Sequence, residues 1–335
     1  MAAVLCLGEA LIDRVGPPGG DPQTEPASCD DRPGGAPANV ACALARLGTA
    51  SAFVGRLGRD AKGAELAQLF AARGVGQRAL QWDATRPTRI VLVRRDHRGE
   101  RVFGGFVGDQ GAGFADQALD AGLASTALRP LLAQARWLLL GTIPLAAPAA
   151  AQAAWAAVRQ AAAAGVALAV DVNWRPTFWD PAADPAAGPT PDQRRRILTL
   201  LAQVRLLKCA VEEAQWLFDS TDPCAISASL PQAPLVVVTD GAGPLRWGRA
   251  QAEPGLWQPP AVAAVDSTGA GDAFTAGLLH GLCGMPGALS HPDPVALRSA
   301  IAFASACGAL VCQGVGAIAP QPEAAQVDAF LAAQG

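Results

Sequence analysis

The stretch Val265-Asp266-Ser267-Thr268-Gly269-Ala270-Gly271-Asp272-Ala273-Phe274 carries the most information in this chain. Its glycines predict a tight turn, and the small residues from Ala270 to Gly281 predict a helix that begins there. The first N–H groups of such a helix lack intrahelical partners and can hold an anion. Asp272 would lie in the first turn, where a carboxylate can accept a hydroxyl proton. Because acidic residues also favour first turns for structural reasons, this stretch alone leaves both interpretations open.

Short apolar runs alternate with helical segments along most of the chain. Strands are predicted at Val4–Gly8, Ala52–Val54, Trp137–Leu140, Ala167–Asp171, Leu206–Lys208 and Leu235–Thr239. Helices are predicted at Asn39–Leu47, Ala61–Arg73, Pro148–Ala164, Gln193–Gln203 and Glu212–Phe218. This alternation indicates an α/β fold with a mostly parallel sheet covered on both faces, in which ligands bind at the carboxyl ends of the strands.

Two parts of the chain interrupt this alternation. Arg14–Pro33 is rich in proline and glycine, so we expect no regular element there. Thr88–Arg94 and Arg101–Phe106 alternate apolar and polar residues, which predicts a hairpin that turns at His97-Arg98-Gly99. Together these pieces could form a small β-sheet lid that excludes water from a cleft, with Phe103 and Phe106 on its apolar face. A hairpin without such a role is the alternative.

Composition excludes several classes of protein. With 26 basic and 29 acidic residues in 335, the net charge is −3, which argues against a nucleic-acid partner. Hydrophobic residues make up 51% of the chain and charged residues 16%, so the chain can bury a large core. Lysine occurs only at positions 62 and 208, and without a Gly-Lys-Ser/Thr sequence there is no Walker-type phosphate loop.

Targeting and metal-binding signals are also weak. The eight cysteines form no Cys-x-x-Cys motif, and the three histidines are dispersed, so a zinc cage is not expected. A signal peptide begins with a basic region, and residues 1–13 contain none. Trp137–Val158 and Ser299–Gln321 are free of charge but are interrupted by glycine and proline or by polar residues. We therefore expect a cytoplasmic protein with no membrane partner.

Two further segments near the N-terminus carry polar side chains suited to a polyol. In Gly34-Gly35-Ala36-Pro37-Ala38-Asn39-Val40-Ala41, the glycines allow backbone to approach a ligand, and Asn39 offers a donor and an acceptor. A helix-capping asparagine is the plain alternative. In Leu7-Gly8-Glu9-Ala10-Leu11-Ile12-Asp13, the Asp13 carboxylate follows the first strand and could bind two neighbouring hydroxyls. Glu9 competes with Asp13 for that role.

Taken together, these segments resemble the two signatures of the ribokinase-like (PfkB-type) carbohydrate kinase family, and specifically its fructokinase branch. The similarity runs along nearly the whole chain, through Gly55–Asp60, Asp171–Arg175, Lys208–Leu217, Val236–Gly241 and Phe303–Pro320. It implies one ribokinase-like kinase domain over residues 1–335, a Rossmann-like three-layer αβα domain with a lid formed by segments at about 13–33 and 86–108. It also implies a kinase that uses ATP and Mg²⁺, with K⁺ as a further cofactor, and lids that pair into homodimers.

The resemblance also implies roles for individual residues. Asp272 matches the catalytic base, and Gly269, Ala270 and Gly271 match the anion hole. The residues that match sugar-binding positions are Asp13, Gly35, Asn39, Phe106 and, near the transferred phosphate, Arg175. Those that match the nucleotide site are Lys208, Thr239, Gly241, Ser305, Gly308 and Ala309. Glu213 matches a Mg²⁺ position, and Asp266 and Thr268 match a loop that holds a monovalent cation.

This chain departs from the family pattern at three positions. Ala210 replaces the usual asparagine three residues before Glu213, so the Mg²⁺ role rests on Glu213 alone. Val107 follows Phe106 where fructokinases have arginine, and Ser305 stands where asparagine is frequent. We therefore expect a sugar kinase with fructose as its first substrate. Ribose, 2-keto-3-deoxygluconate or a nucleoside as acceptor, and a non-catalytic fructokinase-like partner protein, are the alternatives.

Overall fold

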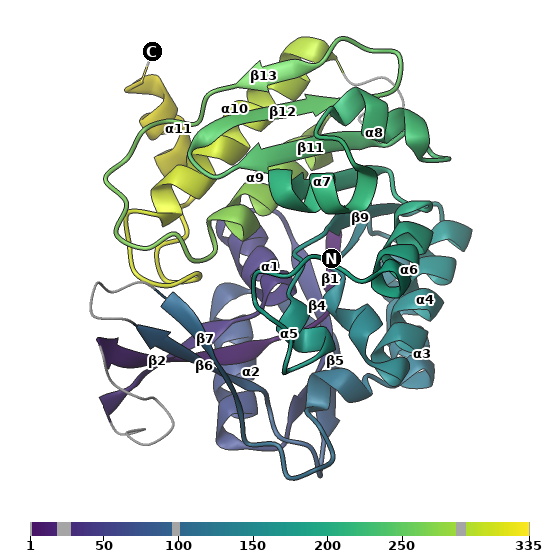
Figure 1. The fold of residues 1–335 in the computed structure, drawn as a ribbon, viewed down its shortest axis with the longest axis vertical. Coiled ribbons are helices and arrows are strands. Elements are labelled where there is room, and N and C mark those ends of the chain that lie inside the picture. Colours follow the sequence, from purple (N-terminus) through teal and green to yellow (C-terminus); the bar gives the residue numbers. More distant parts are fainter. Residues whose placement is uncertain (1, 19–27, 96–100, 286–292, 335) are drawn as a thin grey trace.

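A computed structural model describes residues 2–18, 28–95, 101–285 and 293–334 of the chain (Figure 1). Its centre is a nine-stranded sheet with the strand order β13-β12-β11-β10-β9-β8-β1-β4-β5. The strands are β1 (Val4–Leu7), β4 (Ser51–Gly58), β5 (Gly76–Asp83), β8 (Trp137–Leu140), β9 (Ala167–Asp171), β10 (Leu206–Ala210), β11 (Leu235–Asp240), β12 (Gly243–Gly248) and β13 (Gly255–Trp257). All pairs from β11 to β5 are parallel, and β12 and β13 are antiparallel additions.

Helices cover both faces of this sheet because its strands are apolar on both sides. One face bears α1 (Ala36–Arg46), α2 (Ala61–Arg73), α9 (Ala270–Gly284), α10 (Pro294–Val311) and α11 (Ala324–Ala332). The other bears α3 (Ala121–Leu132), α4 (Pro148–Ala163), α6 (Pro191–Leu201), α7 (Val211–Phe218) and α8 (Pro223–Ser229). In β1, Val4 and Cys6 face the first group and Leu5 and Leu7 the second. The predicted three-layer α/β architecture is therefore confirmed.

The chain reverses its direction of winding at β1. From β1 it proceeds to β4 and β5 on one side, and later to β8, β9, β10 and β11 on the other. In open parallel sheets, loops that leave such a switch point diverge and open a crevice at the carboxyl ends of the strands. Glu9, after β1, and the short 3₁₀ helix Ile143–Ala146, after β8, lie at that edge.

A second sheet of four strands projects from the main body, at the lower left of Figure 1. It consists of β3 (Asp30–Gly34), β2 (Leu11–Pro18), β6 (Ile90–Arg95) and β7 (Arg101–Val107), in that order. The expected hairpin is present as the antiparallel pair β6 and β7, and its predicted turn at residues 97–99 lies outside the described residues.

The expectation that Arg14–Pro33 contains no regular element is wrong. Residues 14–18 belong to β2 and residues 30–33 to β3, which pair antiparallel with Asp13 opposite Arg32. Pro33 is tolerated because β3 is an edge strand, where a missing N–H does not break an inner ladder. Composition alone hid strands that form by pairing with each other.

Several predicted boundaries also shift. The helix expected to begin at Asn39 begins at Ala36, with Gly35 before it and Pro37 in its first turn, a position that proline tolerates. The strand expected at Ala52–Val54 extends over Ser51–Gly58. The helix at Ala61–Arg73 agrees with the prediction and ends at Gly74, whose φ of 74° is left-handed.

One helix within the described ranges, α10, is long and apolar enough to cross a membrane by length and composition. It is also a core helix: 61% of it is buried inside the protein, and residues such as Ile301 and Ala304 pack in the core shared with α9.

The remaining short helical segments in the described ranges are α5 (Pro176–Trp179) and the 3₁₀ turn Ala115–Ala118.

Candidate active site

Two cavities meet at the N-terminus of α9, where both are lined by Ser267 and Gly271. The larger one, of about 620 Å³, is lined mainly by polar and charged side chains. These include Glu9, Asp13, Asn39, Asp171, Asn173, Arg175, Lys208, Glu213 and Asp272, together with Gly35 and Gly269. The smaller one, of about 430 Å³, is lined by small and apolar residues and by Thr239, Gly241, Ser305, Gly308 and Ala309.

Asp272 lies in the first turn of α9 and faces the larger cavity. Its Oδ2 accepts a hydrogen bond of 2.7 Å from Nδ2 of Asn39, which lies in α1. Burial raises the pKa of Asp272 to about 6, although the bond from Asn39 and the charges of Lys208 and Arg175 oppose the rise. Asp272 is thus a carboxylate at neutral pH, yet basic enough to accept a proton. This pairing also gives Asn39 a role beyond helix capping, because Gly35 precedes the helix instead.

The predicted anion hole has the local geometry that an anion site needs. Gly269 precedes α9 with a φ of 79°, and a Cβ there would lie 2.6 Å from the side chain of Ala317. Glycine is therefore required both by the turn and by the close approach. The turn leaves the first N–H groups of a 15-residue helix at the junction of the two cavities, where the helix dipole favours negative charge.

A buried ion pair lies beneath this turn. Nζ of Lys208 is 3.0 Å from both Oδ1 and Oδ2 of Asp171, and Oγ1 of Thr275 donates to Oδ2 at 2.8 Å. Burial opposes the charge of Lys208, but the carboxylates of Asp171 and Glu213 hold its pKa above the ordinary value. A Cβ on Gly271 would lie 3.1 Å from Nζ. A fixed positive charge therefore stands next to the anion hole.

Lys208 lies in a different cavity from the other residues predicted for the nucleotide site, so its nucleotide role stays a prediction. Lys208 lines the larger cavity, and it is not among the described residues that line the smaller one. Its ammonium group is engaged with Asp171, because a buried lysine in the middle of a core strand needs a carboxylate partner. The other predicted nucleotide residues, Thr239, Gly241, Ser305, Gly308 and Ala309, do line the smaller cavity together.

The predicted sugar-binding residues lie together with one exception. Asp13, Gly35, Asn39 and Arg175 all line the larger cavity. Phe106 does not: it packs against Phe103, Phe114 and Phe178, with ring centroids 5.0, 5.9 and 5.0 Å away. Phe103 lines the cavity instead. The antiparallel pair of β6 and β7 shifts register between Leu92 and Val93, an irregularity that sequence periodicity could not place.

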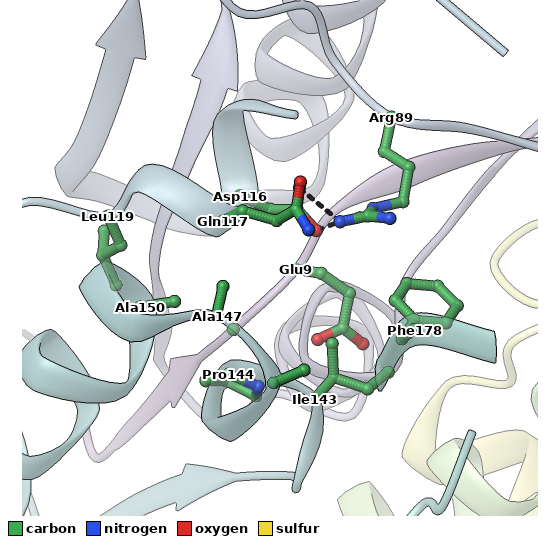
Figure 2. A pocket seen from close by; sticks show the side chains of 12 residues that line it. Glu9, Arg89, Asp116, Gln117, Leu119, Ile143, Pro144, Ala147, Ala150 and Phe178 are labelled. Carbon is green, nitrogen blue, oxygen red and sulfur yellow. Dashed lines mark hydrogen bonds and ion pairs between the residues drawn. The ribbon is translucent and has the colours of Figure 1, made fainter. Parts of the chain in front are cut away.

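Glu9 lines both the larger cavity and a small chamber of about 10 Å³, which has room for about one water molecule. Its Oε1 accepts a hydrogen bond from the N–H of Ala36 at 3.1 Å. Its Oε2 is buried, with no hydrogen-bond partner among the described residues. Figure 2 shows the carboxyl group directed toward Ile143 and away from the Arg89–Asp116 ion pair. Burial raises the pKa of Glu9 to about 8, so Glu9 is neutral at pH 7.

Arg89 anchors the small sheet at this end of the cavity, because it immediately precedes β6. Its guanidinium forms two hydrogen bonds to Asp116, of 2.9 and 3.1 Å, and lies over three aromatic rings. Those rings belong to Phe106, Phe114 and Phe178, with centroids 4.8, 4.4 and 4.8 Å from the guanidinium carbon. Phe106 therefore packs against Arg89 at the base of the small sheet and does not line the larger cavity.

Glu213 fits a Mg²⁺ ion only through water. Its Oε1 accepts from the N–H of Trp174 at 2.6 Å, and its Oε2 accepts from the N–H of Ala210 at 2.8 Å. Each carboxylate oxygen of Glu213 thus accepts one backbone N–H and keeps one lone pair for a water molecule. Within the described ranges, no group of three or more histidine, cysteine, aspartate or glutamate residues could hold a metal ion. Mg²⁺ commonly keeps several waters, so such an indirect contact suits it.

The cation position predicted at Asp266 and Thr268 stays a prediction, and the two side chains are engaged with each other and with neighbouring residues. Oδ1 of Asp266 accepts from the backbone N–H of Thr268 at 3.0 Å and from its hydroxyl at 2.7 Å. Oδ2 accepts from the N–H of Gly316 at 2.9 Å and lies 3.6 Å from Nη1 of Arg32. The carboxylate of Asp266 therefore accepts hydrogen bonds from Thr268 and Gly316, lies near Arg32, and takes the hydroxyl proton of Thr268 in one of those bonds.

Sequence reasoning did not assign roles to several residues of the site. Asp171 and Thr275 complete the network around Lys208, and Asn173, two residues after β9, has a left-handed φ of 42°. A lysine inside an otherwise apolar strand could have signalled the need for a buried carboxylate. Arg32 reaches Asp266 across two distant parts of the chain, and no local pattern indicates that contact.

Comparison with known proteins agrees with this geometry. Residues 1–324 match the family model described as pfkB family carbohydrate kinase. A fructokinase of Vibrio alginolyticus is 32% identical over 336 residues, which cover 99% of each chain.

Two solved structures are also similar. A fructokinase from Xylella fastidiosa with bound ATP has a TM-score of 0.80 and 29% identity, over 100% of this chain and 99% of that one. A double mutant of fructokinase from Vibrio cholerae O395, with fructose, ADP and a potassium ion bound, has a TM-score of 0.78 and 28% identity, over 99% and 98%. The fold, the paired cavities and these matches agree, and the chain belongs to the pfkB family of carbohydrate kinases.

Proposed function

We propose that this protein is an ATP-dependent fructokinase, which transfers the γ-phosphoryl group of ATP to a hydroxyl group of fructose. The observation that carries the proposal is the position of Asp272. It is a buried carboxylate in the first turn of α9, where a polar cavity suited to a sugar meets an uncharged cavity suited to a nucleotide. The similarity to fructokinases over nearly the whole chain supports the same function.

In this mechanism Asp272 accepts the proton of the attacking sugar hydroxyl. Asn39 donates to Oδ2 of Asp272 at 2.7 Å, which fixes the carboxylate and leaves Oδ1 for the substrate. The N–H groups at the start of α9 and the ammonium group of Lys208 offset the negative charge of the transferred group. The chain thus supplies a base and a preorganised positive environment at one junction.

Mg²⁺, when bound with ATP, neutralises the charge of the phosphates and orients them for in-line attack. We propose that its waters face Glu213, whose oxygens are held by backbone N–H groups. Ala210, which stands in the place of the family's asparagine, contributes its N–H to that arrangement rather than a side chain.

We further propose that the small sheet acts as a lid over the sugar. Val91 and Val93 from β6 and Phe103 from β7 line the larger cavity, so an apolar face of this sheet borders the substrate space. Closure would exclude water, which competes with the sugar hydroxyl for the phosphoryl group. Dimerisation through the lid and a cytoplasmic location remain predictions.

A panel of acceptors tests this function. ADP release is measured with ATP and Mg²⁺ in the presence of fructose, ribose, 2-keto-3-deoxygluconate or a nucleoside, and with ATP alone. We expect the highest kcat/KM with fructose. A higher value with another acceptor would reassign the substrate, as the valine at position 107 allows. ADP release that never exceeds the rate with ATP alone would contradict a kinase and favour a non-catalytic partner protein.

A further inference from the structure

Glu9 holds the start of α1 from the loop after β1. Its Oε1 accepts a hydrogen bond of 3.1 Å from the N–H of Ala36, the first residue of that helix. Gly35, which precedes Ala36, has no side chain that could cap the helix. Its backbone lies against Glu9, because a Cβ on Gly35 would be 2.6 Å from the carbonyl oxygen of Glu9. Glu9 therefore contacts the first turn of α1 at two points and replaces the missing side-chain cap.

This first turn positions the side chain that contacts the proposed base. The N–H of Asn39 donates to the carbonyl oxygen of Gly35 at 2.8 Å, and Nδ2 of Asn39 donates to Oδ2 of Asp272 at 2.7 Å. Asn39 follows Ala36 by three residues, so the two lie on the same face of the helix. A shift of the helix start would therefore move the Asn39 donor relative to the carboxylate.

Glu9 holds the helix as a neutral group. It is only 3% exposed, and burial together with the charges of Asp116 and Asp272 raises its pKa to about 8. Its carboxyl group is directed away from Arg89 and Asp116, which form an ion pair with each other (Figure 2). A neutral acid keeps one oxygen as an acceptor, which is Oε1 here, because its proton can reside on Oε2. At neutral pH Glu9 thus holds α1 without adding a charge to the larger cavity.

We infer that Glu9 is a positioning residue for the base: it holds the first turn of α1 so that Asn39 donates to Asp272. The inference rests on the proposed function, in which Asp272 accepts the proton of the sugar hydroxyl. The hydrogen bond from Asn39 stabilises the carboxylate and so lowers the pKa of Asp272. Without Glu9, this bond weakens, the pKa of Asp272 rises further, and its Oδ1 is no longer held for the substrate.

Glu9→Met tests the inference, because methionine has a similar size but no carboxyl oxygen. The kcat for fructose should fall roughly tenfold, as expected for a weakened charge-assisted hydrogen bond, while the KM for ATP should stay within about twofold. The acid limb of kcat/KM should move to higher pH by about one unit. Because Glu9 is neutral at the pH of that limb, the substitution removes no charge there. Glu9→Ala serves as the second variant if Glu9→Met does not fold.

A conservative variant and a double variant test the route of the effect. Glu9→Gln keeps an oxygen that can accept from Ala36, so its kcat should stay within about twofold of the wild type, with the same acid limb. Asn39→Ala removes the contact through which Glu9 is inferred to act. Adding Glu9→Met to Asn39→Ala should therefore lower kcat little further, because the two residues lie on one path.

Ser51→Ala is the matched control, because it removes another buried hydrogen bond to α1. Oγ of Ser51, in β4, donates to the carbonyl oxygen of Ala41 at 2.7 Å and does not involve the first turn of the helix. This variant should lower the melting temperature, since a buried hydrogen bond is lost, but leave kcat and the acid limb unchanged. Kinetic losses in Ser51→Ala equal to those in Glu9→Met would show that Glu9 only stabilises the fold.

Three further results would overturn the inference: a Glu9→Met variant with the kcat and the acid limb of the wild type, losses that add to those of Asn39→Ala, or a Glu9→Gln variant as impaired as Glu9→Met.

Urea unfolding keeps the inference separate from the proposed function. The difference in free energy of unfolding between the wild type and Asp272→Asn varies with pH around the folded pKa of Asp272. If the wild type phosphorylated no sugar, the function would fail, but a shift of this dependence to higher pH in the Glu9→Met background would still support the inference. The same dependence in both backgrounds would contradict it.

Discussion

The two cavities on either side of the α9 N-terminus differ chiefly in charge. The larger is lined by seven ionisable side chains: Glu9, Asp13, Asp171, Arg175, Lys208, Glu213 and Asp272. The smaller is lined mainly by small and apolar residues, a few hydroxyl groups and one glutamine, with no aspartate, glutamate, lysine or arginine among the described residues. The protein thus concentrates its charges on the side that we propose for the acceptor. On the nucleotide side it provides space and backbone.

The charged side can be buried because most of its charges are compensated. Lys208 lies against Asp171, backbone N–H groups hold Glu213, and Glu9 is neutral at pH 7 because burial raises its pKa to about 8. Asp272 is the exception, with one hydrogen bond from Asn39 and a pKa raised to about 6. An incompletely compensated carboxylate is costly for stability but useful as a base.

The largest effect is expected for Asp272→Asn, which keeps the shape of the side chain. It should lower kcat by ~10²–10⁴ because the base is lost. The folded pKa of Asp272 lies above its unfolded value, so its charge destabilises the protein above about pH 6. The variant should therefore melt about 2–4 °C higher at pH 7, with no gain near pH 4. More than a tenth of the wild-type kcat would contradict the assignment.

Lys208→Met should have the next largest effect. It leaves Asp171 as a buried charge without its cation, so the free energy of unfolding should fall by about 3–5 kcal/mol. Urea unfolding measures this change, and the double variant Lys208→Met with Asp171→Asn should recover much of it. Lys62→Ala, at a partly exposed lysine that pairs with Glu65 and Asp31, should change stability by about 1 kcal/mol or less. An equally small effect at Lys208 would mean that the buried pair is not structural.

Asp13→Ala addresses the sugar side of the comparison. The KM for fructose should rise roughly 10–100-fold, the worth of a charge-assisted hydrogen bond, whereas the KM for ATP should stay within about twofold. Initial rates at varied concentrations of each substrate provide both constants. Equal increases in the two KM values would show that Asp13 supports the fold rather than the sugar.

Gly308→Ala is the corresponding change on the nucleotide side, with a smaller effect. A Cβ there would lie 3.1 Å from the carbonyl oxygen of Ala270, so α9 and α10 must separate slightly at a point where both residues line the smaller cavity. The KM for ATP should rise several-fold while that for fructose stays unchanged. The same kinetics apply, and a change in the fructose KM alone would contradict the division between the two cavities.

How far the sequence predicted this molecule depends on whether a feature is local. The buried parallel strands, such as Ala167–Asp171, and the turn at Gly269 follow from local patterns and are present as expected. The strands β2 and β3 were not predicted, because their proline-rich segments become regular only by pairing with each other. Likewise, Phe103 lines the cavity where Phe106 was predicted, and the register of β6 and β7 is irregular nearby.

The same distinction holds within the site. Asp272 and Asn39 were each named from motifs, but the bond between them joins residues 233 positions apart and only the structure shows it. The engagement of Lys208 with Asp171 and of Asp266 with Arg32 also arises from tertiary packing. Motifs therefore named individual candidate residues, and the fold decided which partner each one has.

The pH dependence of kcat/KM for fructose tests the central claim, that Asp272 acts as a base whose pKa burial has raised. Because the carboxylate is the active form, kcat/KM should fall tenfold per pH unit on the acid side, with an apparent pKa of about 6. The residual activity of Asp272→Asn should lack this limb. A wild-type value that stays constant down to about pH 4.5, or the same limb in Asp272→Asn, would contradict the account.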